Sequence, residues 1–493
     1  MWTFRVYEKS KFTREEAALD DATCNSQKRE IQENLARRLF IGAVAVCMLV
    51  SIAVYNGYPT VFSDTGGYLL TGKFLVALRP FRAPGYALFT RFTSFGKSAW
   101  FTIAAQAVLV VYVLYETSIH LLGRDRRFAD VYFLASACVL ASLTSLPWLV
   151  SLLMPDVFAG VLFLAAFLLA FAGDLRLIQR IALALILMIS VAAHSSLLPI
   201  AVLFVMAAII LKYFTRRTIE FPSTKSILVW LLTPIITAGF LTAGLNRQMG
   251  LGFSLSPSKN AFLLARLFGD GLAADFLREN CPARHFVSCR YLSRLPRTEE
   301  EFLFQSSLFP ELLHGHQDEM EKIVRGTILA YPARFVTSSA KQTMLQLTSL
   351  RTGDEIRTYG ARQWNEKVIP RVFPGDLQAF LNARQYHDRL THLADASAFV
   401  DTKIFWLSFA SCLLFVRTDR FARVNLFFYS AIAFLVINAS ICATFAGVYD
   451  RYQGRVAWII PFSLTAYAGS FARDWKPWMD AEKIPEKLEA GAD

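Results

Sequence analysis

Long apolar stretches alternate with short polar loops along most of the chain. Several stretches run for about 20 residues without a charge, which is the length at which a helix crosses the hydrocarbon layer of a bilayer. The pattern predicts about ten membrane-spanning helices. Their expected limits are 39–56, 99–120, 131–147, 156–173, 181–195, 197–213, 227–245, 401–416, 424–445 and 456–471.

Basic residues concentrate in every second loop. The basic segments are ARR before the first predicted span, GRDRR, DLRLIQR, KYFTRR and RTDRFAR between later spans, and FARDWK after the last. The positive-inside rule places all of them, and both termini, in the cytoplasm. The alternate loops then face outward, which for a bacterial inner-membrane protein means the periplasm.

The predicted organisation follows from this topology. It comprises a cytoplasmic tail (1–36), a transmembrane module (37–245) containing a first outer loop (57–97), an extracytoplasmic unit (246–400), a second set of transmembrane helices (401–471) and a cytoplasmic tail (472–493). The expected fold class is therefore an all-α polytopic membrane protein.

The segment 246–400 is too long to be a structureless loop. Apolar residues recur at helical spacing in 260–280 and again in 309–347, with a break at Pro332, so we expect a small, mostly helical subdomain. Cys281 and Cys289 lie in this subdomain, and in an oxidising compartment they are expected to form a disulfide. Their spacing does not suit a zinc site.

The amino-acid composition agrees with a membrane protein and limits the kinds of binding partner that we expect. The chain is 54% hydrophobic and has a formal net charge of +12. In a membrane protein such a charge is typical of cytoplasmic Lys and Arg, and of binding to anionic lipids or phosphate groups, so no nucleic acid is expected. The sequence has no Walker A run, HExxH or GxSxG motif, which disfavours nucleotide-driven transport and serine hydrolysis.

The first outer loop carries the densest polar chemistry, in GYPTVFSDTGGYLLTGKFLVALRPFRAPGYALFTRF (57–92). Asp64 stands beside two glycines, which allow a backbone to approach a ligand closely. Arg79 and Arg82 are suited to bidentate binding of phosphate, and the Asp64 carboxylate is suited to deprotonating a hydroxyl. Tyr86 closes the segment as a further site candidate. The alternative is that Asp64 only caps a helix.

An acid just after the first span, followed by an R-x-P-G-Y segment before the second, resembles the GT-C glycosyltransferases, which include the protein mannosyltransferases and the aminoarabinose transferases. The resemblance implies a GT-C-like core, a sugar donor carried on polyprenyl phosphate, and Asp64 as catalytic base. It implies no cofactor. Two outer acids could hold a divalent metal ion, but no ligand spacing calls for one.

Two further candidates lie at the outer ends of predicted spans. Asp156, in LMPDVFAG, occupies the position where GT-C enzymes often carry a second acid. His194, in VAAHSSLLP, is expected either to contact the donor phosphate or to share a proton with Asp64. The alternatives are a helix cap for the acid and an ordinary polar turn for the histidine.

A late segment, AGVYDRYQGRVAWIIP, gathers Asp450, Arg451, Tyr452 and Arg455 between the last two spans. Its RY pair resembles the closing motif with which several GT-C families bind lipid phosphate. Snorkelling of these cations to lipid headgroups is the alternative. Lys259, in SLSPSKN, is a weaker candidate for the same phosphate.

The sequence thus predicts a glycosyltransferase that moves a sugar from a polyprenyl-phosphate donor to a glycan, lipid or protein acceptor. Two alternatives stay open. One is an enzyme like the O-antigen ligases and polymerases, which rely on arginines and a histidine in a large outer loop. The other is a non-catalytic lipid or polysaccharide transporter, although transporters usually carry ionisable residues near the membrane midplane.

Overall fold

The computed structural model describes residues 32–76, 82–123, 126–215, 221–281, 283–353, 356, 359–416 and 421–481. These residues form helices joined by short turns, and the only β-type pairing among them is an isolated parallel bridge between Thr60 and Leu152. This agrees with the predicted all-α class.

A first helix covers residues 32–49. The later helices are α2 (Ser51–Asn56), α3 (Thr65–Phe74), α4 (Pro84–Ser94), α5 (Ala99–Leu122), α6 (Arg126–Leu143), α7 (Leu146–Ser151), α8 (Val157–Phe171), α9 (Leu177–Ala193), α10 (Leu197–Thr215), α11 (Thr224–Gln248), α12 (Lys259–Gly269), α13 (Leu272–Asn280), η1 (Val287–Arg294), η2 (Glu301–Gln305), α14 (Leu308–Leu313), α15 (Gln317–Ala330), α16 (Pro332–Thr348), α17 (Tyr359–Val372), η4 (Pro374–Asp376), α18 (Leu377–Leu381), α19 (Thr391–Phe415), α20 (Ala422–Phe445), α21 (Asp450–Ala457) and α22 (Ile459–Ala481).

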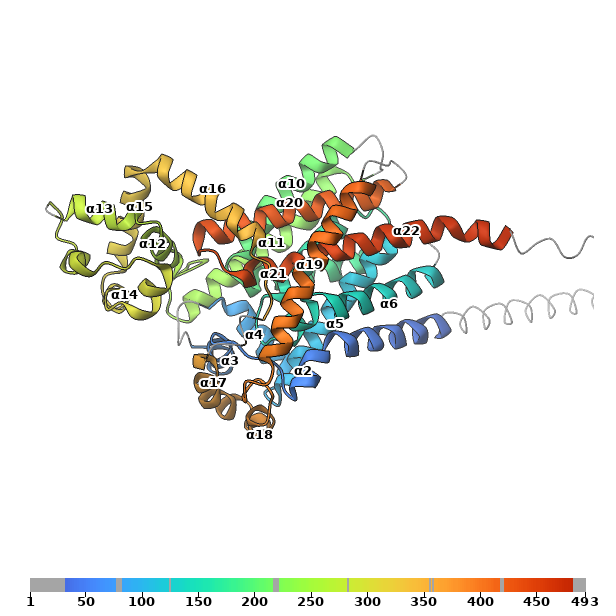
Figure 1. Cartoon of the computed structure of the whole chain (residues 1–493), viewed down its shortest axis with the longest axis horizontal. Coiled ribbons are helices and arrows are strands. Elements are labelled where there is room, and N and C mark those ends of the chain that lie inside the picture. Colours follow the sequence, from blue (N-terminus) through green and yellow to red (C-terminus); the bar gives the residue numbers. More distant parts are fainter. Residues whose placement is uncertain are drawn as a thin grey trace, which may run out of the picture.

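A bundle of long helices forms the larger part of the molecule (Figure 1). Each predicted span falls on helical residues, although the spans 39–56, 131–147 and 456–471 each extend over two helices. Within the described residues, five helices are long and apolar enough to cross a membrane, namely α5, α10, α11, α19 and α20. The chain is therefore a membrane protein, and the remaining five spans stay a prediction.

Helix α8 lies at the centre of the bundle. All of its residues are buried, and it packs against α5, α9, α10, α11, α20 and α21. Phe163 contacts Phe204 and Phe434 through their rings. The apolar run of α8 thus reflects burial within the protein, and this packing fixes the residue that precedes the helix, Asp156.

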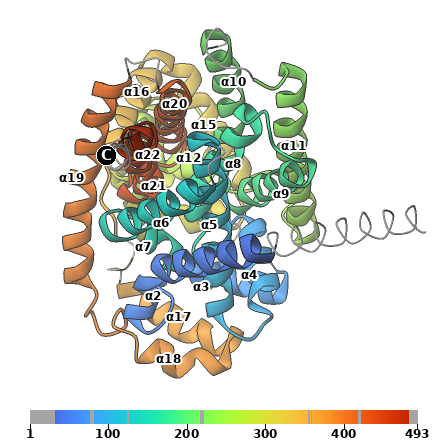
Figure 2. The ribbon, with the colours of Figure 1, turned by 90° about the vertical axis from the view of Figure 1, so that its right-hand side faces the viewer.

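The predicted subdomain 246–400 divides into two parts. Helices α12–α15 and the first turn of α16 share a hydrophobic core of their own and form the lobe at one end of the molecule (Figure 1). Helix α17 instead packs on α3, and α18 packs on α17 and on Tyr58 in the loop before α3; Figure 2 shows both helices at the edge of the bundle. The predicted break falls at Pro332, which begins α16.

Two side chains from the α18 region fix the loop before α3. The Asp376 carboxylate accepts hydrogen bonds from the Tyr58 hydroxyl (3.1 Å), the Ser98 hydroxyl (3.0 Å) and the Ala99 amide (2.9 Å). The Gln385 side chain exchanges two hydrogen bonds with the backbone of Val61. This loop leads directly to Asp64, so α18 helps to position the acid from more than 300 residues away.

The two glycines after Asp64 differ in their surroundings, and only Gly66 is required for packing. A Cβ on Gly66 would collide with the indole ring of Trp364 on α17, whereas a Cβ on Gly67 would meet only the Arg82 side chain, at 3.5 Å. The sequence led us to expect that the backbone here approaches a ligand closely. At Gly66 the close neighbour is instead Trp364 of α17.

Gly66→Ala is expected to lower the free energy of unfolding by about 1–3 kcal/mol, because the partly buried indole ring of Trp364 must move. Gly67→Ala is the matched control and should stay close to the wild type, because 3.5 Å is an ordinary contact distance. Denaturant unfolding in mild detergent measures both. Equal stabilities for the two variants would contradict the packing described here.

Candidate functional site

Asp64 stands at the N-terminus of α3 without acting as its cap. Its side chain makes no capping hydrogen bond to the helix. Instead, the Arg82 guanidinium donates to Oδ1, and Arg451 Nη1 lies 3.9 Å from Oδ2. The Asp64 side chain is 17% exposed, so solvent reaches this ion pair. The geometry therefore favours a charged cluster over the capping alternative.

Asp156 repeats this arrangement deeper in the protein. It precedes α8, makes no side-chain capping bond, and is only 2% exposed. Oδ1 lies 3.8 Å from Arg455 Nη1 and 4.0 Å from Arg451 Nε. Neither carboxylate oxygen has a hydrogen-bond partner among the described residues. A buried carboxylate with two cations just beyond bonding distance can accept a hydrogen bond from a group placed between them.

The backbone brings the two acids together. The Thr60 amide donates to the Ser151 carbonyl (2.9 Å), and the Leu153 amide donates to the Thr60 carbonyl (3.0 Å). This short parallel pairing joins the loop before α3 to the loop before α8. Both acids follow their loops by a few residues, so they reach the same region from distant parts of the sequence.

Helix α21 supplies two of the three cations. Arg451 and Arg455 are four residues apart and therefore share one face of the helix. Arg455 is fully buried, and its guanidinium donates to Asn438 Oδ1 (2.8 Å) and Ser196 Oγ (3.1 Å). The Arg451 guanidinium lies over the Phe62 ring (4.7 Å) and near the Tyr452 ring (5.2 Å). These contacts hold both cations toward the acids.

Together these residues form what we call the charged cluster, comprising Asp64, Arg82, Asp156, Arg451 and Arg455. Its outer members are partly exposed and its inner pair is buried. Three guanidiniums face two carboxylates, so the cluster carries one excess positive charge. An anion at the exposed side would balance it.

His194 lies in the turn between α9 and α10, beside the cluster. Its Nδ1 is 2.9 Å from Ser196 Oγ and accepts from the Ser196 amide (3.2 Å). Because the Ser196 amide can only donate, Nδ1 carries no hydrogen and the imidazole is in its neutral form. Among the described residues His194 makes no hydrogen bond to Asp64, so sharing a proton with that acid stays a prediction.

The other predicted site residues differ in their placement. Tyr86 is fully buried and donates to Gln106 Oε1 (2.7 Å), which makes it part of the packing beneath the cluster. The Tyr452 ring lies against both cations of α21. The Asp450 carboxylate accepts from the Arg351 amide.

Two predicted phosphate ligands are not brought to the cluster. Lys259 is exposed at the start of α12, and no interaction described in the structure joins it to the cluster. Arg79 lies outside the described residues.

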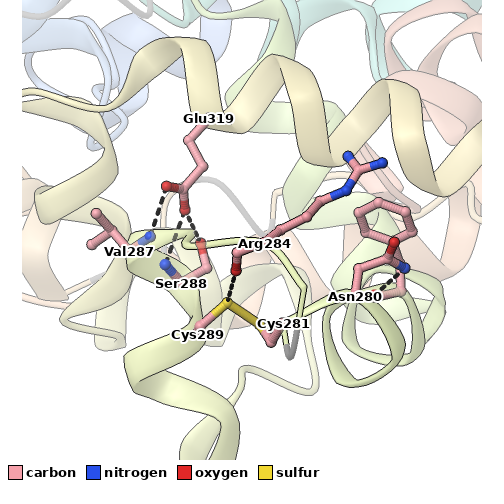
Figure 3. Close-up of a disulfide and its surroundings, with 8 residues drawn as sticks. Asn280, Cys281, Arg284, Val287, Ser288, Cys289 and Glu319 are labelled. Carbon is pink, nitrogen blue, oxygen red and sulfur yellow. Dashed lines mark hydrogen bonds between the residues drawn. A yellow bond between two sulfur atoms is a disulfide. The ribbon is translucent and has the colours of Figure 1, made fainter.

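The lobe formed by α12–α15 contains the predicted disulfide between Cys281 and Cys289 (Figure 3). Next to it, the Glu319 carboxylate accepts hydrogen bonds from the Val287 amide (2.7 Å) and from the Ser288 amide and hydroxyl (2.9 and 2.6 Å). The disulfide ties η1 to the end of α13, and the Glu319 hydrogen bonds tie η1 to α15; both features lie outside the charged cluster. They therefore stabilise the lobe rather than contribute to the candidate site.

No metal-binding group of three or more His, Cys, Asp or Glu is found in the part of the chain that the structure describes. The two cluster acids are each surrounded by guanidiniums, which makes a divalent cation a poor fit between them.

Three residues of the site were not predicted from the sequence. Asn438 accepts a hydrogen bond from Arg455, and Ser196 contacts both Arg455 and His194. The Phe62 ring lies under the Arg451 guanidinium. Asn438, which lies in the middle of the mostly apolar helix α20, is a signal that the sequence offered, because polar groups within a span need partners.

Comparison with known proteins adds no relative, since no protein-family model, curated protein or solved structure matches the chain. The class that the fold defines is a helical membrane protein. The resemblance to GT-C glycosyltransferases rests on the residues named above and remains a proposal.

Proposed function

We propose that this protein is an integral-membrane glycosyltransferase that moves a sugar from a polyprenyl-phosphate donor to an acceptor hydroxyl at the outer membrane surface. The observation that carries the proposal is the charged cluster. Stretches around residues 64, 82, 156 and 451–455, far apart in the sequence, supply two acids and three guanidiniums to one place.

The charge of the cluster suits a phosphate ligand. Arg82 and Arg451 are its partly exposed cations, and each can present a planar guanidinium to phosphate oxygens. The excess positive charge matches a donor that carries one negative charge. Arg455 is buried and bonded on two sides, so it contributes to the field rather than direct contact.

The surroundings suit a lipid-linked donor. Exposed apolar side chains lie at the ends of α3 and α4 farthest from Asp64, including Phe74, Val76, Phe92 and Phe95. These two helices pack on each other, and Arg91 donates to the carbonyls of Gly72 and Lys73 at the end of α3. Apolar side chains of this kind can insert into a bilayer surface. Asp64 would then lie near the headgroups.

The proposed reaction is a direct displacement. The acceptor hydroxyl gives its proton to Asp64 Oδ2 as its oxygen bonds to the anomeric carbon. The bond between that carbon and the phosphate oxygen breaks, and polyprenyl phosphate leaves with the electron pair. Arg82 and Arg451 stabilise the charge that grows on the departing phosphate. The anomeric configuration inverts.

Asp156 has a positioning role in this scheme. It is buried behind Arg451 and Arg455, and its distances to them are 4.0 and 3.8 Å. It therefore acts on the reacting groups through the cations, not as a second base.

The test is donor binding and transfer by purified protein in nanodiscs, with radiolabelled polyprenyl-phosphate sugars and an envelope extract as acceptor. We expect label to pass to the acceptor and free polyprenyl phosphate to appear. Arg451→Gln should weaken donor binding about 10–100-fold, since a charged hydrogen bond contributes about 1.5–3 kcal/mol.

Arg325→Gln is the control, because it makes the same chemical change at an exposed position of α15. It should bind the donor as the wild type does. If the wild type neither binds nor consumes any lipid-linked sugar, or if both variants bind equally, the proposed function is wrong.

A further inference from the structure

The hydrogen bonds that lead to His194 have a fixed direction. Asn438 Nδ2 donates to the Tyr452 carbonyl (2.6 Å), so its Oδ1 is left to accept from Arg455. Arg455 Nη2 also contacts Ser196 Oγ at 3.1 Å. A guanidinium can only donate, so Ser196 Oγ is the acceptor in that contact.

The contacts of Ser196 determine the tautomer of the imidazole. Ser196 Oγ accepts from Arg455, and its own single hydrogen can point either to His194 Nδ1, 2.9 Å away, or to the Cys442 sulfur, with which the Ser196 side chain also interacts. The Ser196 amide, which can only donate, also points to Nδ1 at 3.2 Å. The amide by itself requires that Nδ1 carries no hydrogen, so the proton of the neutral ring is on Nε2.

The charges around His194 favour the same neutral state. Arg451 and Arg455 approach from α21, and Arg82 approaches from the loop before α4. The acids of this region, Asp64 and Asp156, are themselves matched by those guanidiniums. Among the described residues, Nε2 has no hydrogen-bond partner, so its N–H is available to a ligand.

We infer that His194 is a neutral hydrogen-bond donor, through Nε2–H, to a phosphate oxygen of the ligand bound at the charged cluster, and that it does not act as a base. The inference rests on the proposed function for the identity of that ligand. It assigns two oxygens of one phosphate group to donors of different kinds, a guanidinium and an uncharged imidazole. A neutral donor adds a hydrogen bond without adding charge, so it orients the phosphate without strengthening the ionic attraction.

Three variants separate these roles. His194→Gln places an amide N–H near the position of Nε2, His194→Asn keeps only a group at the level of Nδ1, and His194→Ala keeps neither. The probe is polyprenyl phosphate, titrated into protein in nanodiscs of neutral lipid. We expect His194→Gln to bind within about threefold of the wild type, and His194→Asn and His194→Ala to bind about tenfold more weakly, as for one neutral hydrogen bond.

A pH profile of transfer supplies the second measurement. A base at His194 would give the wild type an acid limb near the usual histidine pKa, and that limb would vanish in His194→Gln. We expect the two profiles to have the same shape between about pH 5.5 and 8. A limb seen only in the wild type would overturn the inference.

The remaining outcomes are distinct. Equal binding by the wild type and all three variants, or a His194→Gln as weak as the folded His194→Ala, would overturn the role of His194 and leave the proposed function standing. A wild type that does not bind polyprenyl phosphate would overturn the proposed function, and the inference with it. Thermal unfolding of each variant shows which are folded.

Discussion

Replacing Asp64 with asparagine is expected to reduce glycosyl transfer by about 10²–10⁴-fold, which is the usual contribution of a positioned general base. Asparagine has nearly the same shape, and its amide oxygen can still accept from Arg82, which bonds Asp64 in the wild type. It cannot take a proton from the acceptor hydroxyl. The measurement is the turnover of radiolabelled donor by folded protein in nanodiscs, with donor affinity measured beside it.

Asp318→Asn makes the same chemical change on the exposed first turn of α15 and should retain full turnover. Asp64→Asn should keep its donor affinity within a few-fold, since the cations remain. Turnover above about a tenth of the wild-type value in folded Asp64→Asn would exclude Asp64 as the base. That result would favour the alternative in which arginines and a histidine carry the reaction.

The helical bundle could be predicted because helices buried in lipid or protein consist of long apolar stretches, which are visible in the sequence. The apolar stretches marked each long helix, including α5, α11 and α20. The same signal could not distinguish lipid from protein as the apolar surroundings. Helix α8 illustrates this, since its unbroken apolar run is buried among other helices and is shorter than a typical span.

The charged cluster was predictable in part. Asp64 and Arg82 lie 18 residues apart in one segment between predicted spans, and Arg451 and Arg455 are one helical turn apart, so their chemistry was visible locally. Their mutual distances depend on pairing such as that of Thr60 with Ser151, which joins residues 91 positions apart. A single sequence does not report such long-range contacts.

The role of the segment 246–400 was the least predictable. Its helices α12–α15 and its helices α17–α18 have similar polarity, yet they belong to different hydrophobic clusters. The deciding contacts, Gly66 against Trp364 and Asp376 against Tyr58, are specific pairs with no periodic pattern. Periodicity identifies a helix and its apolar face, but it does not identify the partner of that face.

Arg455→Met is expected to lower the free energy of unfolding by about 3–5 kcal/mol, the range measured when one partner of a buried ion pair is removed. The Arg455 side chain is fully buried, and its loss leaves the Asp156 carboxylate without its inner cation. It also leaves Asn438 Oδ1 and Ser196 Oγ without their donor. Denaturant unfolding in mild detergent gives the value, and Arg325→Met on exposed α15 is the control, with a change expected within about 0.5 kcal/mol.

A second substitution identifies the cause of that loss. If the destabilisation comes from an uncompensated charge, then adding Asp156→Asn to Arg455→Met should recover part of it, because a neutral amide costs less to bury than a carboxylate. Asp156→Asn alone should be destabilising, since it leaves the buried Arg455 charge facing an amide. The two changes are then coupled, and their combined effect is smaller than the sum. Strictly additive losses would mean that the 3.8 Å between Asp156 and Arg455 carries no interaction, and that Asn438 and Ser196 alone account for the burial of the arginine.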